Sequence, residues 1–389
     1  MATQEKEVTV YIGRFNPFHL GHAHILERAL NTSKLVIVLI GSAGQARSIK
    51  NPFTFEERRS MIEVWHRDNG GDGPNTKLIV LPLRDFPYSN NLWIKTVQAT
   101  VTGAIRKHNI TNNELLLQVH LTGSNRDDST WYLSAFPQWK TDFVAPWNAG
   151  LIQSNQNVNA TSVRKVLYES SLTSDDFEGL HSKVPVSTRR FLQDFAMRGG
   201  LTSLRNEYKF IVDYKKAWSV APYAPTFNTA DAVVIQSGHV LVVKRGAQPG
   251  KGLWALPGGF VNQKERIKDA AIRELMEETG IRLAEGKRSE DITRSMLEGS
   301  IREKEIFDNP ERSARGRTIT IAYLMRLDDT KPLPKVKGMN VPYYESNGKE
   351  EVETEEAIWL PLDVALSKTS LWFEDHHSIV EWAANVKDE

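Results

Sequence analysis

The chain has 389 residues, 40% hydrophobic and 25% charged, which is long enough for two or three ordinary globular domains. Its formal net charge of +1 excludes a global attraction to nucleic acid or to anionic membranes. It contains no cysteine, which excludes disulfides, thiol nucleophiles and cysteine-ligated zinc.

No apolar signal segment opens the sequence, and the longest strongly apolar run, residues 35–40, is too short to span a bilayer. A cytoplasmic location is therefore expected, with no nucleic acid or membrane as partner.

The first half of the chain alternates strand-like and helix-like stretches. Strands are predicted at residues 8–12, 35–40, 77–81 and 115–121, and helices at residues 24–30, 55–65 and 92–106. This βαβα order implies an α/β domain with a parallel sheet covered on both faces. Ligands in such folds bind at the carboxyl ends of the strands.

A glycine-containing turn follows the first predicted strand and leads into a helix. It reads Gly13-Arg14-Phe15-Asn16-Pro17-Phe18-His19-Leu20-Gly21-His22. Such a turn can direct backbone N–H groups and a helix N-terminus at phosphate oxygens. His19, His22 and Arg14 add donors for charge that develops on a phosphorus atom. Taken alone, the short pattern is equally compatible with structural histidines.

Three further segments extend this pattern. Gly41 and Ser42 close the second strand, residues 48–58 include Lys50, and residues 159–164 place Thr161, Ser162 and Arg164 at a helix start. An N-capped helix with a surface arginine is the alternative reading of the last segment.

Together these segments resemble the archaeal-type nicotinamide mononucleotide (NMN) adenylyltransferases over residues 8–185. The resemblance implies a Rossmann-like nucleotidyltransferase domain in which His19, His22, Arg14 and Arg164 act on ATP. Trp93 would stack on the pyridinium ring, although a core position is the alternative, and Lys50 stands where arginine is common. The implied substrate-binding residues are Gly13, Phe15, Gly41, Ser42, Lys50, Asp85, Asn90 or Asn91, Trp93, Gly123, Thr161 and Ser162.

A change in amino-acid pattern separates this region from the rest of the chain. Residues 187–218 are helical and charge-rich, and residues 219–231 are predicted to form an extended connector. A hairpin around Ser237-Gly238 then opens a second domain, and residues 331–356 are predicted to form a long surface loop. The predicted organisation is a first domain at 1–186, an appendage and linker at 187–228, and a second domain at 229–389.

The second domain contains three glutamates at helical spacing. Residues 269–279 are helix formers that end at Gly280, so Glu274, Glu277 and Glu278 share one helix face. These carboxylates repel one another unless a divalent cation lies between them, and oxygen ligands suit Mg²⁺ or Mn²⁺. A solvated acidic helix face is the alternative.

The full pattern, G-x5-E-x7-R-E-U-x-E-E-x-G-U, resembles the Nudix box. Its positions are Gly259, Glu265, Arg273, Glu274, Glu277, Glu278 and Gly280. The resemblance implies an α/β/α domain with a mixed sheet, a metal site at Glu274, Glu277 and Glu278, and Glu265 bracing Arg273. The general base stays open between Glu277, Glu278 and the later residues Glu350, Glu351, Glu353, Glu355 and Glu356.

A basic segment with Arg312, Arg315 and Arg317 precedes the strand predicted at residues 318–324. It resembles the corresponding segment of ADP-ribose pyrophosphatases, with Ser313 in place of the usual aspartate, and a solvated basic loop is the alternative. The arginines would bind phosphate or ribose oxygens.

The tandem order resembles the bifunctional NMN adenylyltransferase/Nudix hydrolases of bacteria. That resemblance implies adenylyl transfer from ATP to NMN giving NAD, and Mg²⁺-dependent hydrolysis of ADP-ribose. The alternatives are a pyridine-nucleotide or ADP-ribose sensor without turnover, and the same reactions on other nucleotides such as NADH. The sequence leaves the oligomeric state open, a homo-oligomer included.

Overall fold

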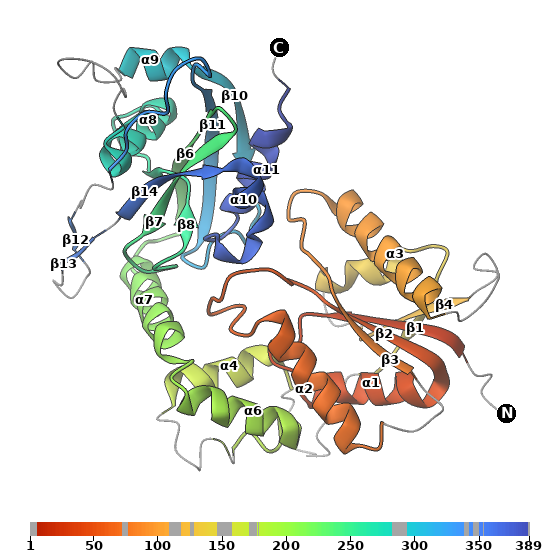
Figure 1. The fold of residues 1–389 in the computed structure, drawn as a ribbon. Coiled ribbons are helices and arrows are strands. Elements are labelled where there is room, and N and C mark those ends of the chain that lie inside the picture. The colour runs from red at the N-terminus through yellow and green to blue at the C-terminus, as the bar shows by residue number, and fades with distance from the viewer. Residues whose placement is uncertain are drawn as a thin grey trace. The chain divides into compact units, whose positions relative to one another are not determined.

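The computed structural model describes residues 6–71, 77–108, 118–124, 128–145, 158–170, 177, 179–281, 294–337, 342–344, 350–352 and 354–387. The chain divides into two compact units, Met1–Arg205 and Asn206–Glu389, drawn in Figure 1. None of the helices in these described stretches combines the length and apolar character that a bilayer crossing requires.

The first unit contains a five-stranded sheet whose order is β3-β2-β1-β4-β5 and whose neighbouring strands are all parallel. This confirms the predicted parallel α/β architecture. Its strands are β1 (Lys6–Gly13), β2 (Ser33–Ile40), β3 (Lys77–Pro82), β4 (Val119–Gly123) and β5 (Lys140–Phe143). Its helices are α1 (Leu20–Thr32), α2 (Phe55–Asp68), α3 (Asn90–Lys107), η2 (Asp128–Ser134), α4 (Ala160–Glu169) and α6 (Val186–Met197). Residues 109–117, where the fourth strand was predicted to begin, lie outside the described residues.

The alternation of side chains along the strands explains the core of this unit. Val8, Val10 and Ile12 of β1 pack with Val97 and Val101 of α3 in one cluster. Nearly every residue of β2 is buried, as expected of a central strand covered on both faces. The helices therefore hold the sheet rigidly and leave the loops at the strand ends to carry chemistry.

The second unit contains a mixed sheet with the order β10-β11-β6-β7-β14. Strands β6 and β11 are parallel, and the other neighbours in this order are antiparallel. Its strands are β6 (Thr226–Gln236), β7 (His239–Arg245), β8 (Trp254–Ala255), β9 (Gly258–Phe260), β10 (Ile301–Phe307), β11 (Arg317–Arg326), β12 (Pro342–Tyr344), β13 (Glu350–Val352) and β14 (Thr354–Pro361). Its helices are α7 (Thr202–Trp218, which begins before the division), α8 (Ile267–Thr279), α9 (Arg294–Gly299), α10 (Leu362–Ser367), η3 (Thr369–Leu371) and α11 (His376–Asn385).

Helices cover both faces of this sheet. Ala232 and Val234 of β6 pack in a cluster with residues of α8, whereas Val233 and Ile235 pack in a cluster with residues of α11. Adjacent strand residues point to opposite faces, so α8 and α11 lie on opposite sides of β6. This is the predicted α/β/α arrangement.

Two predicted segments need correction. The connector predicted at residues 219–231 is shorter, because β6 already begins at Thr226. The long loop predicted at residues 331–356 contains the antiparallel pair β12–β13, and its end is the start of β14, which pairs with β7. Proline, glycine and glutamate dominate that stretch, and local composition carries no information about its pairing partners.

Candidate functional sites

Each imidazole of the His19 and His22 pair accepts a backbone hydrogen bond. His19 is the buried N-cap of α1, and the two rings stack with centroids 3.6 Å apart. His22 N–H donates to His19 Nδ1 at 3.3 Å, and His19 N–H donates to His22 Nδ1 at 3.3 Å. Because both Nδ1 atoms accept, each neutral ring carries its proton on Nε2. The start of α1 thus carries two oriented imidazole N–H groups beside a helix N-terminus.

The loops after β1 and β2 meet at Arg58 of α2. Its guanidinium is buried and donates to the carbonyl oxygens of Arg14 and Gly41 at 2.7 Å each, and of Ser42 at 3.1 Å. Burial lowers the pKa of Arg58 to about 10, so the side chain remains charged at neutral pH. Arg58 belongs to the predicted motif at residues 48–58, but the sequence assigned it no role in the site, although the Thr54-x-x-Glu57 capping box that starts its helix is visible in the sequence.

Further predicted residues join this cluster. Gly41 N–H donates to Gly13 O at 2.9 Å, and Ser42 N–H donates to Asp85 Oδ1 at 3.0 Å. Arg164 of α4 donates to Asn16 O at 2.8 Å and to Thr161 Oγ1 at 3.1 Å. Burial, offset in part by Tyr168 and reinforced by the positive charge of Arg14, lowers the pKa of Arg164. The structure therefore brings the predicted loops after β1, β2 and β3 together with the start of α4.

Two of the predicted residues have special backbone conformations. Phe15 and Ser42 have positive φ angles of 52° and 51°. This left-handed conformation is uncommon in residues other than glycine, asparagine and aspartate, and its occurrence here fits loops shaped for a ligand.

The remaining predicted residues of this unit lie around the same sheet edge. Trp93 is half-buried and contacts the rings of Trp131, Tyr132 and Phe136. Part of the Trp93 side chain is therefore packed in an aromatic cluster, as the alternative of a core position expects. Gly123 ends β4, and Ser162 N–H donates to Asn159 Oδ1 at the start of α4. Lys50 is half-buried in the loop before α2, and Asn90 and Asn91 are exposed at the start of α3.

In the second unit Arg273 binds three glutamates. Its guanidinium donates to Glu265 at 2.7 Å, to Glu274 at 2.8 Å and to Glu277 at 2.9 Å. The hydrogen bond from Arg273 lowers the pKa of Glu265 to about 2, and Glu265 raises the pKa of Arg273 above its ordinary value. Arg273 therefore compensates carboxylate charge on α8 and fixes it to the loop that follows β9.

Glu274 and Glu278 both contact strand β9, at Gly259 and Gly258 respectively. Glu278 is buried and accepts from Gly258 N–H at 3.0 Å and from Thr354 Oγ1 at 3.2 Å. A Cβ atom on Gly259 would lie 2.4 Å from Glu274 Oε1, so the carboxylate lies directly against the glycine. The donors of α8 fit a hard divalent cation. Within the described residues, no group of three or more His, Cys, Asp or Glu side chains is already arranged around a metal position.

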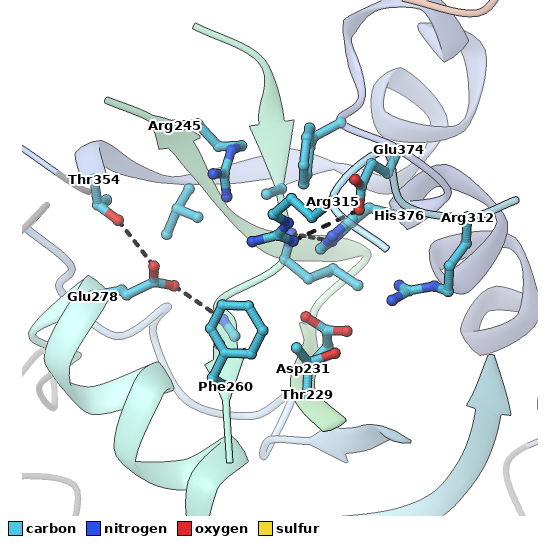
Figure 2. Close-up of a pocket in the computed structure, with 16 residues that line it drawn as sticks. Thr229, Asp231, Arg245, Phe260, Glu278, Arg312, Arg315, Thr354, Glu374 and His376 are labelled. Carbon is cyan, nitrogen blue, oxygen red and sulfur yellow. Dashed lines mark hydrogen bonds and ion pairs between the residues drawn. The ribbon is translucent and has the colours of Figure 1, made fainter. Parts of the chain in front are cut away.

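A pocket adjoins Gly258 and Gly259 of β9, and Figure 2 shows its lining. Glu278 lies on one side, and Arg245, Arg315, Glu374 and His376 lie around the rest. Asp231 is buried in the lining and accepts from Thr320 Oγ1 at 2.6 Å, and burial raises its pKa to about 6. Burial, together with the charges of the nearby arginines, lowers the pKa of His376 well below its usual value, so the ring is neutral.

The predicted arginines have different positions. Arg312 is buried in a bidentate ion pair with Asp375, at 2.9 and 2.8 Å, and also lines the pocket. Arg315 lies over the ring of Phe260, 5.2 Å from its centroid. Arg317 instead turns to Asp308, whose carbonyl oxygen accepts a hydrogen bond from it. The segment therefore presents Arg315 and part of Arg312 to the pocket.

The candidates for the general base of the hydrolase site also lie in different places. Glu355 pairs with Lys244 at 3.0 Å, and Glu356 is exposed on β14. Glu353 and the side chains of Glu350 and Glu351 lie outside the described residues. Among the candidates that the structure describes, Glu278 lines the pocket.

Sequence reasoning missed Asp231, Arg245, Glu374 and His376, all of which line this pocket. They come from β6, from β7, from the segment before α11 and from the first residue of α11, and no local spacing connects them. One of them could have been suspected from the sequence: Arg245 stands at the end of the apolar strand pattern of β7.

Comparison with known proteins agrees with both units. Residues 225–383 match the NUDIX domain, and residues 10–166 match the cytidylyltransferase-like domain. A curated nicotinamide/nicotinic acid mononucleotide adenylyltransferase of Acinetobacter baylyi is 30% identical over 200 residues, covering 51% of this chain and 92% of the relative.

Two crystal structures from Francisella tularensis are similar over almost the whole chain. One is a bifunctional NMN adenylyltransferase/ADP ribose pyrophosphatase, 31% identical, with a TM-score of 0.80, covering 97% of this chain and 98% of the other. The other is described as the same kind of protein complexed with AMP and Mn ion, 32% identical, with a TM-score of 0.78 and the same coverage.

Fold and site together define an enzyme in which a nucleotidyltransferase unit is followed by a Nudix hydrolase unit. A divalent metal belongs to the chemistry of the second class. The chain belongs to the family of bifunctional NMN adenylyltransferase/Nudix hydrolases.

Proposed function

We propose that the first unit transfers the adenylyl group of ATP to NMN, giving NAD and pyrophosphate, and that the second hydrolyses ADP-ribose to AMP and ribose 5-phosphate. We further propose Mg²⁺ as the metal used. The observation that carries the first activity is the pair of oriented imidazoles at the start of α1. The observation that supports the second activity is that the carboxylates of Glu274 and Glu278 lie together against Gly259 and Gly258 of β9.

In the first reaction a phosphate oxygen of NMN attacks the α-phosphorus of ATP, and the bond to the β-phosphate oxygen breaks. Charge moves onto the departing pyrophosphate, where the Nε2–H groups of His19 and His22 and the guanidinium groups of Arg14 and Arg164 donate to it. The reaction needs no side-chain nucleophile, because positioning of the substrates and stabilisation of the developing charge supply most of the rate acceleration.

In the second reaction a water oxygen adds to one phosphorus of the diphosphate, and the bridging P–O bond breaks. A bound divalent cation would neutralise the diphosphate and lower the pKa of the attacking water. Glu274, Glu277 and Glu278 would hold it, and Arg273 would give up part of its contact with Glu274 and Glu277. Among the described candidates for the general base, Glu278 is the one in the pocket lining, and we assign it the proton from water.

Two incubations test this proposal. ATP, NMN and Mg²⁺ are expected to give NAD and pyrophosphate, and ADP-ribose with Mg²⁺ is expected to give AMP and ribose 5-phosphate, each followed by chromatography. Absence of NAD in the first refutes the synthetic activity, and absence of AMP in the second refutes the choice of ADP-ribose. NADH in a third incubation decides whether another dinucleotide is the preferred substrate.

A further inference from the structure

The carboxylate of Glu374 lies in the wall of the hydrolase pocket and has an unsatisfied oxygen. The side chain is 11% exposed, and Oε1 is buried with no hydrogen-bond partner among the described residues. Oε2 is 3.9 Å from Arg315 Nη2, which is beyond hydrogen-bond distance. A carboxylate with no hydrogen-bond donor is unfavourable, and a donor can approach Glu374 from the pocket that this residue lines.

The backbone holds this carboxylate in place at the expense of strain. Glu374 has a φ of 45°, a left-handed conformation that a glutamate rarely adopts. Its neighbours are fixed on both sides: Phe373 N–H donates to Trp254 O at 2.8 Å, Asp375 forms the bidentate pair with Arg312, and His376 Nδ1 accepts from Leu256 N–H at 3.0 Å. Anchors before and after Glu374 impose its conformation and direct its side chain into the pocket.

The position of Glu374 identifies the part of the substrate that it meets. Figure 2 shows Glu278 and Glu374 on opposite sides of the pocket, with Arg315 beside Glu374. The diphosphate belongs at the α8 side, where the metal-binding carboxylates lie. A carboxylate repels phosphate oxygens and accepts from O–H and N–H groups, so the opposite side suits a sugar or a base.

We propose that Glu374 is a specificity-determining residue that accepts a hydrogen bond from a hydroxyl or amino group in the nucleoside part of the substrate. This inference rests on the proposed ADP-ribose hydrolysis for the identity of the ligand. The shared chemistry is a neutral donor, which a ribose hydroxyl or the amino group of adenine can supply.

Binding of ADP-ribose in the presence of EDTA tests the inference without turnover. The Glu374→Gln and Glu374→Gly proteins are expected to bind roughly tenfold to a hundredfold more weakly than wild type in titration calorimetry. The control is Glu303→Gln, an exposed carboxylate on β10 of the same unit outside the pocket lining, which is expected to bind as wild type does. Equal binding by wild type and both Glu374 variants overturns the inference.

Thermal unfolding separates a binding role from a structural one. Glycine adopts the left-handed conformation without strain, so Glu374→Gly is expected to melt at the wild-type temperature or above it. A lower melting temperature that accompanies the weaker binding would assign Glu374 a structural role and overturn the inference.

Substrate analogues then identify the donor. Inosine diphosphate ribose lacks the amino group of adenine, and deoxy analogues lack single ribose hydroxyls. For the analogue that lacks the true donor, the difference between wild type and Glu374→Gln is expected to disappear, because the pair no longer interacts. A constant difference for all analogues contradicts direct contact. Wild type that binds ADP-ribose but does not hydrolyse it when Mg²⁺ is added would refute the proposed function and leave this result intact.

Discussion

Gly259 shows at the residue scale why the Nudix box begins with glycine. A Cβ atom there would lie 2.4 Å from Glu274 Oε1, which is the mobile end of a side chain. We expect Gly259→Ala to leave the fold intact and to displace the carboxylate, lowering the kcat for ADP-ribose by about 100-fold. Gly299→Ala is the control, since its Cβ meets nothing within 4 Å. A fully active Gly259→Ala enzyme would show that the position of Glu274 is unimportant.

Asp231 gives a prediction about pH. Burial raises its folded pKa from 3.8 to about 6, so its ionisation destabilises the folded state. This unfavourable contribution is absent below the unfolded pKa, grows between about pH 4 and pH 6, and is complete above pH 6. Asp231→Asn is therefore expected to be more stable than wild type by about 3 kcal/mol at pH 8, with the difference vanishing towards pH 4.

Denaturant unfolding of the hydrolase unit within the full chain, followed at pH 4.5 and at pH 8, measures this difference. Asp363→Asn, an exposed aspartate of α10, serves as the control. A stabilisation by Asp231→Asn that is the same at both pH values, or larger at pH 4.5, would contradict the destabilising role of the ionised Asp231.

The contrast between Glu274 and Glu374 shows what the sequence can provide at this scale. Glu274 was predictable because its helical neighbours define a face, whereas the position of Glu374 depends on the anchoring of Phe373 to Trp254 and of Asp375 to Arg312, which only the folded chain brings together. Sequence spacing finds sites on one element and misses walls built from several. The site residues named from resemblance remain predictions until variants are assayed.

At the scale of elements, α2 controls the geometry of the nucleotidyltransferase loops through Arg58. Arg58→Met would leave the carbonyl oxygens of Arg14, Gly41 and Ser42 without their buried donor. We expect a loss of about 3 kcal/mol in the stability of the first unit and a parallel loss of NAD synthesis, with ADP-ribose hydrolysis retained.

The neighbouring Arg59 provides a matched control. It is half-exposed and forms an ion pair within its own helix, with Glu63 at 2.6 Å, so Arg59→Met is expected to change stability by less than about 0.5 kcal/mol. Thermal unfolding and both activity assays compare the two variants. Similar effects of the two substitutions would remove the special role assigned to Arg58.

The strands illustrate which elements a sequence determines. The β2 stretch and the Ser237-Gly238 turn were predictable, because an apolar run and a turn with two positive φ angles, 48° and 71°, are local signals. Strand β14 was not predicted, and its first three residues fell within a predicted loop, because its stability comes from pairing with β7 more than a hundred positions earlier. Local composition describes turns and central strands well, and it describes strands that depend on a distant partner poorly.

At the scale of the whole molecule, the chain carries two sets of phosphate chemistry in two compact units. The residues of the first set, around His19 and Arg58, all lie before position 206, and those of the second, around Glu278 and Glu374, all lie after it. We infer that the two activities are chemically independent.

The most direct test is to measure both activities in one preparation of the Glu278→Gln protein. NAD synthesis from ATP and NMN is expected to stay within about twofold of wild type, while hydrolysis of ADP-ribose is expected to fall by at least about 100-fold, because the proton acceptor is lost. Loss of both activities together, or full retention of hydrolysis, would contradict this expectation.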